Sequence, residues 1–406
     1  MSPSWRASHH TLAGPAGSPR RGRGRAHDPG RGLRVGVDSY GLEPLGLEPL
    51  AVLRWAIDHG AGGVQFSGIA APWRDRVDRA YLADMRQLAA THGLYLEWGG
   101  ASHIPRRMDT WERADLLARN RRAAAEAQAL GARVVRSCSG GLMRWDPSAS
   151  STDALLRETA AAVTSQATML RDHGVVLAIE LHLEFTTHKL LRLFEQCDAA
   201  PGDYLGVVLD TMNLRTLLED PLRATQRILP WVVATHVKDG GLRLTRDGLE
   251  SFPTGIGESA IDLPRILVRL AGQAPGCRTL SVEDHGGTFS LLISDRRFLR
   301  ESPDLTAEEL VDLVALARRT EAALDAGRCR APDVLHLLSG ARSSPTRASR
   351  RCTRCTASSG TASGCGRSFR TSRRWPRWSW HTTRNTCARR RTTRTTLTWR
   401  ARSSSS

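Results

Sequence analysis

The repeated alternation of short apolar runs with helical patterns limits the fold of this chain more than any other feature. Each run has four to seven mostly apolar residues, which is typical of a strand covered on both faces. Eight such units over about 290 residues favour a closed (β/α)8 TIM barrel, in the α/β class, over an open doubly wound sheet. The expected strands span residues 33–38, 63–67, 94–98, 133–137, 175–180, 204–210, 232–236 and 279–283.

Residues with helical spacing lie between these runs, notably over 78–91, 113–130, 155–171 and 264–271. Four glycines precede strands at positions that suit a left-handed helix C-cap: Gly60, Gly93, Gly131 and Gly174. A last helix is expected over 306–324, because Thr306 and Glu309 form a capping box at its start. We expect this helix to close the ring.

The two ends of the chain differ in composition from the body. Residues 1–32 are rich in Gly, Pro, Arg and Ser without apolar periodicity, so we expect them to be disordered. The barrel is assigned to 33–327, and 328–406 form a low-complexity tail that is also expected to be disordered. Residues 341–406 contain seventeen Arg and no Lys, Asp or Glu, and therefore carry the whole formal net charge of +17. Residues 33–340 hold 35 basic and 40 acidic residues, which argues against a nucleic acid partner for the barrel.

The composition of the tail suggests two further hypotheses about function. Arginines interleaved with tryptophans could stack on RNA bases, which would make the chain an RNA-binding scaffold that acts through Trp375, Trp378 and Trp380. A zinc site is a weak alternative, since the spacing matches no standard knuckle among Cys352, Cys355, Cys365 and His381 or Cys387. The chain lacks an apolar run long enough for a signal peptide or a membrane span, and its cysteines are scattered, so we expect a cytoplasmic protein without a membrane partner.

Polar residues end each of the last four expected strands: Glu180, Asp210, His236 and Glu283. The carboxyl ends of barrel strands meet at one face, so these side chains should converge there. Each follows an apolar run, where an unpaired charge is costly. A divalent cation is the simplest common partner, and three oxygen donors with one nitrogen favour Mn2+, Mg2+ or Co2+. Taken singly, each could instead be a solvated or Arg-paired residue at the end of a strand.

Other residues are candidates for substrate binding. His182 could bond a substrate hydroxyl, and Lys238 could hold a phosphate or hydroxyl, or be an exposed loop lysine. Arg136 interrupts the fourth strand and needs an anion if it is buried. Glu97 either lines the pocket or forms a buried salt bridge with Arg136. His285 either closes the site or belongs to a turn with the glycines that follow it.

The order Glu, Asp, His, Glu at these strand ends resembles the xylose isomerase-like barrel superfamily, in its sugar phosphate isomerase/epimerase branch. The resemblance covers about residues 33–327 and rests on the motifs IELH, LDTMN, THVKD and VEDHGG. It implies that the four strand-end residues are metal ligands. It also places Asn213 in the substrate site, where related ketose 3-epimerases usually have a histidine three residues after the strand-six aspartate.

Such a site supports proton transfer next to a carbonyl group. A metal can stabilise the enediolate as a Lewis acid, while Glu180 and Glu283 act as base and acid. We therefore expect an isomerase or epimerase of a small sugar, sugar phosphate or polyol. An inosose-type dehydratase is the alternative on the same metal site, and the acidic body speaks against the apurinic endonuclease branch. The sequence is also compatible with a homo-oligomer.

Overall fold

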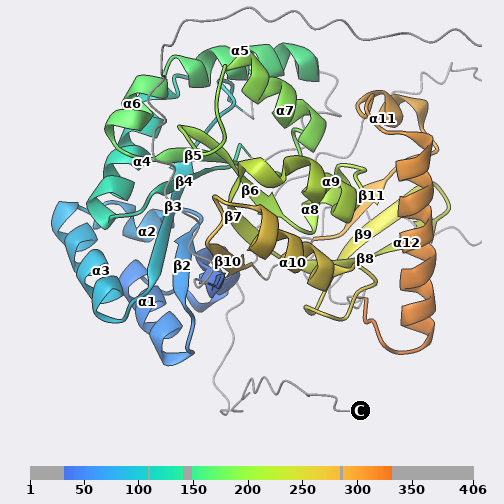
Figure 1. Ribbon diagram of the computed structural model, residues 1–406, viewed down its shortest axis with the longest axis horizontal. Coiled ribbons are helices and arrows are strands. Elements are labelled where there is room, and N and C mark those ends of the chain that lie inside the picture. The colour runs from blue at the N-terminus through green and yellow to red at the C-terminus, as the bar shows by residue number, and fades with distance from the viewer. Residues whose placement is uncertain (1–31, 108–109, 140–148, 284–286, 332–406) are drawn as a thin grey trace, which may run out of the picture. The chain divides into compact units, whose positions relative to one another are not determined.

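The computed structural model describes residues 32–107, 110–139, 149–283 and 287–331. In this part of the chain eight parallel strands close into a barrel (Figure 1), in the order β1-β10-β7-β6-β5-β4-β3-β2. The predicted (β/α)8 barrel is therefore confirmed. Its strands are β1 (Arg34–Asp38), β2 (Gly63–Phe66), β3 (Tyr95–Ala101), β4 (Val134–Ser137), β5 (Val176–Glu180), β6 (Leu205–Asp210), β7 (Val232–Val237) and β10 (Thr279–Val282).

The first strand closes the barrel by pairing on both sides. Val37 of β1 lies opposite Val64 of β2, and Arg34 of β1 lies opposite Thr279 of β10. Buried aliphatic side chains from the strands and the helices around them form one large core, to which Leu53, Leu177 and Leu209 belong. Burying one such side chain contributes about 1.5–3 kcal/mol to the stability of the fold. Apolar runs therefore predict the strands well.

The helices follow the expected pattern with two exceptions, the first being that the helix expected over 113–130 begins only at Leu117. Gly60, Gly93, Gly131 and Gly174 adopt φ between 64° and 73°, as the C-cap prediction requires. The expected helix over 155–171 is instead two helices, because Ser165 and Gln166 both donate side-chain hydrogen bonds to the Ala162 carbonyl and interrupt the backbone pattern. The helices are α1 (Pro49–Asp58), α2 (Ala71–Arg74), α3 (Arg79–Thr91), α4 (Leu117–Leu130), α5 (Thr152–Thr164), α6 (Ala167–Asp172), α7 (Thr187–Gln196), α8 (Asn213–Thr216), α9 (Pro221–Ile228), α10 (Leu263–Gln273), α11 (Arg296–Arg300) and α12 (Ala307–Asp325), with 3-10 helices at Ser39–Leu45 and Leu229–Trp231.

A second, antiparallel sheet follows β7, in a region where no strands were expected. It consists of β8 (Asp239–Thr245), β9 (Gly248–Thr254) and β11 (Phe289–Leu291), in the order β11-β9-β8. Helix α12 covers this sheet (Figure 1), and its Leu313 and Leu316 share a small core with Leu242 and Leu249. The expectation that α12 closes the ring was therefore wrong. Val35 of β1 remains 55% exposed on the barrel wall.

The ends of the chain lie largely outside the described residues. The predictions of disorder concern 1–32 and 328–406, of which 1–31 and 332–406 lie outside the described residues, as do the tail residues considered for RNA or zinc. Within the described part of the predicted tail, Cys329 is only 3% exposed. Within the described ranges Cys197, Cys277 and Cys329 are buried free thiols. No helix in those ranges combines the length and the hydropathy that crossing a bilayer requires.

Candidate metal centre

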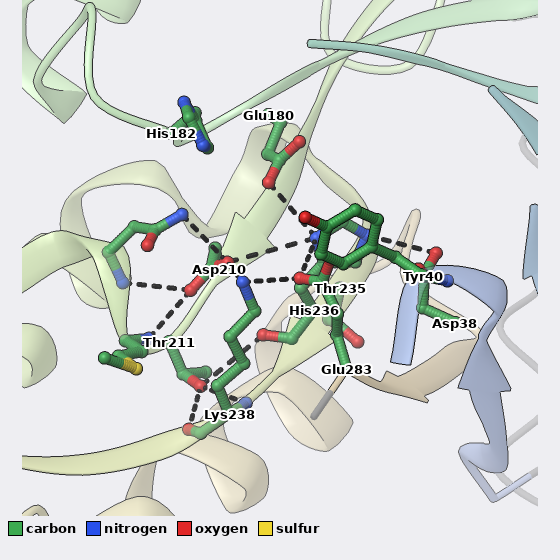
Figure 2. Close-up of polar contacts among 12 residues, drawn as sticks. Asp38, Tyr40, Glu180, His182, Asp210, Thr211, Thr235, His236, Lys238 and Glu283 are labelled. Atoms are coloured by element: carbon green, nitrogen blue, oxygen red, sulfur yellow. Dashed lines mark hydrogen bonds and ion pairs between the residues drawn. The ribbon is translucent and has the colours of Figure 1, made fainter. Parts of the chain in front are cut away.

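The four strand-end residues meet at the carboxyl end of the barrel. Glu180 ends β5, Asp210 ends β6, His236 lies near the end of β7, and Glu283 directly follows β10. One ligand atom from each lies within 4.8 Å of those of the other three. Asp210 and His236 are completely buried, and the two glutamates are at most 3% exposed. Figure 2 shows the three carboxylates gathered around the His236 ring.

The His236 imidazole has a different environment at each nitrogen. Its Nδ1 lies 3.2 Å from Glu180 Oε1 and 3.0 Å from Glu283 Oε2. Its Nε2 lies 3.6 Å from Asp38 Oδ2 and hydrogen-bonds to Gln65 Oε1. Burial would lower the pKa of His236, but the Glu283 and Glu180 carboxylates raise it well above its usual value. The Nδ1 atom therefore faces the carboxylate cluster.

Two buried cations adjoin the carboxylates. Arg136 donates from Nε to Glu180 Oε2 at 2.8 Å. Lys238 Nζ lies 2.8 Å from Asp210 Oδ2 and 2.5 Å from Glu283 Oε2. Lys238 is only 4% exposed, so the interpretation of this residue as an exposed loop lysine was wrong. The anion that Arg136 was expected to need is the Glu180 carboxylate.

These cations keep the two glutamates ionised. Burial would raise the pKa of Glu180, but Arg136 and His236 hold it well below its usual range. Burial acts in the same direction on Glu283, where His236 and Lys238 overcome it and lower the pKa. Both side chains are therefore carboxylates at neutral pH, which is the form that binds a metal.

The donor set and the charge of the cluster both fit a divalent cation. With the imidazole neutral, as it is in a metal ligand, the four carboxylates around His236 and the two cations leave a formal excess of two negative charges: Asp38, Glu180, Asp210 and Glu283 against Arg136 and Lys238. A buried imbalance of this size is costly, and a divalent ion would remove it. Three carboxylate oxygens and one imidazole nitrogen form a donor set that could hold a metal ion.

Asn213 and Glu97 lie beside the cluster in different ways. Asn213 begins α8, and its Nδ2 donates to Asp210 Oδ2 at 2.9 Å, so it orients that carboxylate. Glu97 lies inside the barrel on β3, where it accepts hydrogen bonds from Gln65 and Thr279, each at 2.5 Å. The alternative salt bridge between Glu97 and Arg136 was wrong. Burial raises the pKa of Glu97, and the two accepted hydrogen bonds oppose that shift.

A pocket of about 440 Å³ opens above the cluster. Its apolar side includes Phe66, Ile69 and Trp73. Its polar side chains include Tyr40, Arg136, His182, Glu180 and Glu283. Glu180 and Glu283 thus belong to the cluster and also line a space large enough for a small molecule.

His182 pairs with the buried carboxylate of Glu184. Its Nδ1 lies 3.6 Å from Glu184 Oε2, and the other oxygen of Glu184 lies 3.1 Å from His103 Nε2. Burial would lower the pKa of His182, but Glu184 raises it above its usual value. His285, the remaining candidate, lies outside the described residues.

The sequence analysis missed three residues at this site. Asp38 ends β1, accepts hydrogen bonds from Ser67 Oγ and the Tyr40 backbone at 2.8 Å, and approaches His236. Tyr40 lines the pocket together with Glu180 and Glu283, and burial raises its pKa. Gln65 lies on β2 and contacts the same ring. Asp38 carried a usable signal, because it is an acid at the end of a strand, as Asp210 is.

Comparison with known proteins adds the family. The chain resembles solved structures of an L-ribulose 3-epimerase (20% identity, 77% of this chain and 100% of that one, TM-score 0.46) and a D-psicose 3-epimerase (16%, 73% and 98%, 0.47). It also resembles a probable 3-DHS dehydratase from Bacillus anthracis (13%, 68% and 100%, 0.47). No curated protein matched the chain. The model of the xylose isomerase-like TIM barrel family matches residues 53–310, more than half of the sequence, and the chain therefore belongs to that family.

Proposed function

We propose that this protein is a metal-dependent enzyme that isomerises or epimerises a small sugar, sugar phosphate or related polyol. The observation that carries the proposal is the cluster of Glu180, Asp210, His236 and Glu283 within 4.8 Å. Two of its members, Glu180 and Glu283, line a pocket. These four residues would hold Mn2+, Mg2+ or Co2+. When bound, the ion supplies Lewis acidity toward adjacent carbonyl and hydroxyl oxygens of the substrate.

Glu180 and Glu283 are the proposed catalytic residues. Both line the pocket, and both are held as carboxylates by neighbouring cations. A carboxylate at the substrate can remove the proton from the carbon next to the carbonyl and leave an enediolate. If the other glutamate returns a proton to the opposite face of that carbon, the product is an epimer. If one glutamate returns it to the neighbouring carbon, the product is an isomer.

The remaining pocket residues would bind the substrate. His182 and Tyr40 can hydrogen-bond to hydroxyl groups, and Arg136 adds a positive charge at the pocket wall. The apolar side chains of Phe66 and Trp73 suit the C–H surface of a sugar. Lys238 contacts Asp210 and Glu283, so we assign to it the orientation of these two carboxylates.

Hydrogen exchange into the substrate tests this function. The protein is incubated in deuterated water with Mn2+, Mg2+ or Co2+ and a panel of ketoses, aldoses, their phosphates and inosose. We expect deuterium at the carbon next to the carbonyl of one substrate, detected by NMR and mass spectrometry. A product with enone absorbance would instead identify a dehydratase.

The variants Glu180→Gln and Glu283→Gln separate proton transfer from metal binding. Each should lower the exchange rate about 100- to 10,000-fold, which is the usual contribution of a general base. Glu195→Gln is the matched control, because Glu195 is exposed on α7. If either site variant keeps its metal and exchanges at the wild-type rate, that glutamate is a ligand only, and the acid/base role passes to His182 or Lys238.

A further inference from the structure

Three interior residues from the first strands of the barrel converge on the side of His236 that faces away from the carboxylate cluster. Gln65 on β2 lies in register with Asp38 on β1 and with Glu97 on β3. Gln65 is completely buried, and Glu97 is 4% exposed. Neither Gln65 nor Glu97 is among the residues that line the pocket. Their place in the barrel therefore points to the imidazole and not to the substrate.

We propose that Glu97 is a positioning residue, which acts through Gln65 to fix the His236 ring with Nδ1 toward the metal and the hydrogen on Nε2. The inference rests on the proposed function, since it assigns how one of the proposed ligands is held. It gives Glu97 a role that differs from the pocket-lining or salt-bridging role expected from the sequence.

The direction of the hydrogen bonds carries the argument. Gln65 donates from Nε2 to Glu97 Oε2 at 2.5 Å, while Thr279 donates to the other Glu97 oxygen at 2.5 Å. A carboxylate only accepts, so the amide nitrogen of Gln65 must face Glu97. The amide oxygen then faces His236 Nε2, and an amide oxygen also only accepts. The hydrogen of the neutral imidazole therefore belongs on Nε2.

Asp38 supports the same assignment independently of the amide orientation. Its Oδ2 lies 3.6 Å from His236 Nε2, so two acceptors face this nitrogen. The lone pair of Nδ1 then points toward Glu180 and Glu283. Histidine ligands commonly donate their second ring N–H to such an acceptor, which fixes both the ring and the tautomer.

Metal affinity measured by titration calorimetry with Mn2+ on the full chain tests the relay. Glu97→Leu removes the acceptor that orients Gln65, and Gln65→Leu removes the bond to His236. We expect each to weaken Mn2+ binding about 10- to 100-fold, the usual effect of losing an outer-shell partner. Glu97→Gln can still present a carbonyl oxygen to Gln65, so it should restore most of the affinity that Glu97→Leu loses.

Tyr95→Phe is the matched control. It removes a hydrogen bond of 2.9 Å between Tyr95 Oη and Ser281 Oγ in the barrel interior, and it leaves the bonds to His236 intact. Its Mn2+ affinity should equal that of the wild type. A loss as large as that of Glu97→Leu would show that any interior hydrogen bond matters equally, and would overturn the inference.

Nitrogen NMR of histidine-labelled protein with bound Mg2+ or Zn2+ gives a second measurement, with His236 assigned by a His236→Gln variant. We expect the hydrogen on Nε2 and the ion on Nδ1, and a hydrogen on Nδ1 would overturn the inference. A wild type that binds none of these ions would overturn the proposed function and this inference with it. If the wild type binds while Glu97→Leu and Gln65→Leu keep full affinity, only the inference fails. Should Glu97→Leu not fold, Gln65→Leu and the wild-type spectrum decide.

Discussion

Metal binding should stabilise the fold, because the candidate ligands come together only in the folded chain. They are spread from Glu180 to Glu283 along the sequence, and they lie within 4.8 Å of one another only through the barrel. A ligand that binds the folded state alone adds about 2.7 kcal/mol at one hundred times its Kd. Each kcal/mol raises the Tm of a domain of this size by about 2–4 °C, so we expect a rise of about 5–10 °C.

The variant Asp210→Asn should abolish this rise at the Mn2+ concentration that saturates the wild type. The substitution keeps the shape of the side chain but removes one charge from a cluster with a formal excess of two, and it leaves Lys238 with one charged partner fewer. Scanning calorimetry with chelator and with stepped Mn2+ measures the effect. For the wild type, each tenfold step above Kd should add about 1.4 kcal/mol.

Asp203→Asn provides the control for this comparison. Asp203 is an exposed carboxylate just before β6 that pairs with Arg171 at the surface, so its variant should keep the full metal-dependent rise. A wild-type Tm that does not change over a thousandfold range of Mn2+, Mg2+ and Co2+ would refute the reasoning. So would an Asp210→Asn protein that responds as strongly as the wild type.

Two further predictions concern the pH dependence and the boundaries of the fold. Burial opposes the ionisation of Glu184, but hydrogen bonds from His103 and His182 lower its pKa below 4.5. Its contribution to the free energy of unfolding is therefore complete above pH 4.5 and falls as the pH falls. The pKa of His182 is raised above 6.5, so its contribution is complete below pH 6.5 and falls as the pH rises. Urea unfolding should therefore show the largest loss for Glu184→Gln between pH 4.5 and 6.5, and a loss that is constant from pH 3 to 9 would contradict this. A fragment of residues 33–331 should unfold in one transition and bind Mn2+ like the full chain. The fragment includes Cys329 because this residue packs on Phe252 and Ala323. Aggregation of the fragment under conditions where the full chain is soluble would contradict this prediction.

The sequence predicted the strands well because buried parallel strands are continuous apolar runs, and a helix end at a left-handed glycine is a local event. The juxtaposition of Glu180, Asp210, His236 and Glu283 followed from one further rule, that the carboxyl ends of barrel strands meet. The sheet of β8, β9 and β11 was missed because its strands contain Gly240, Gly241 and Pro253, which normally indicate a loop. The position of α12 depends on that sheet and was missed with it.

The ion pairs and hydrogen bonds between side chains of different barrel strands could not be predicted in the same way. Arg136 and Glu97 are both polar interruptions of apolar strands, and the sequence offered no reason to prefer one partner over another. The structure pairs Arg136 with Glu180 on the next strand, and Glu97 with Gln65 in direct register. The contact between Gln65 and His236 depends on ring closure, which no local pattern contains.

The closure of the barrel by β1 and β10 also sets the order in which the site can be built. Asp38, Gln65 and Glu97 are synthesised before any of the four candidate ligands, because they belong to the first three strands. They cannot act on His236 until β10 has emerged from the ribosome and paired with β1. A nascent chain that stops before residue 279 lacks both Glu283 and this pairing. The four candidate ligands can therefore come together only after the last barrel strand has been made.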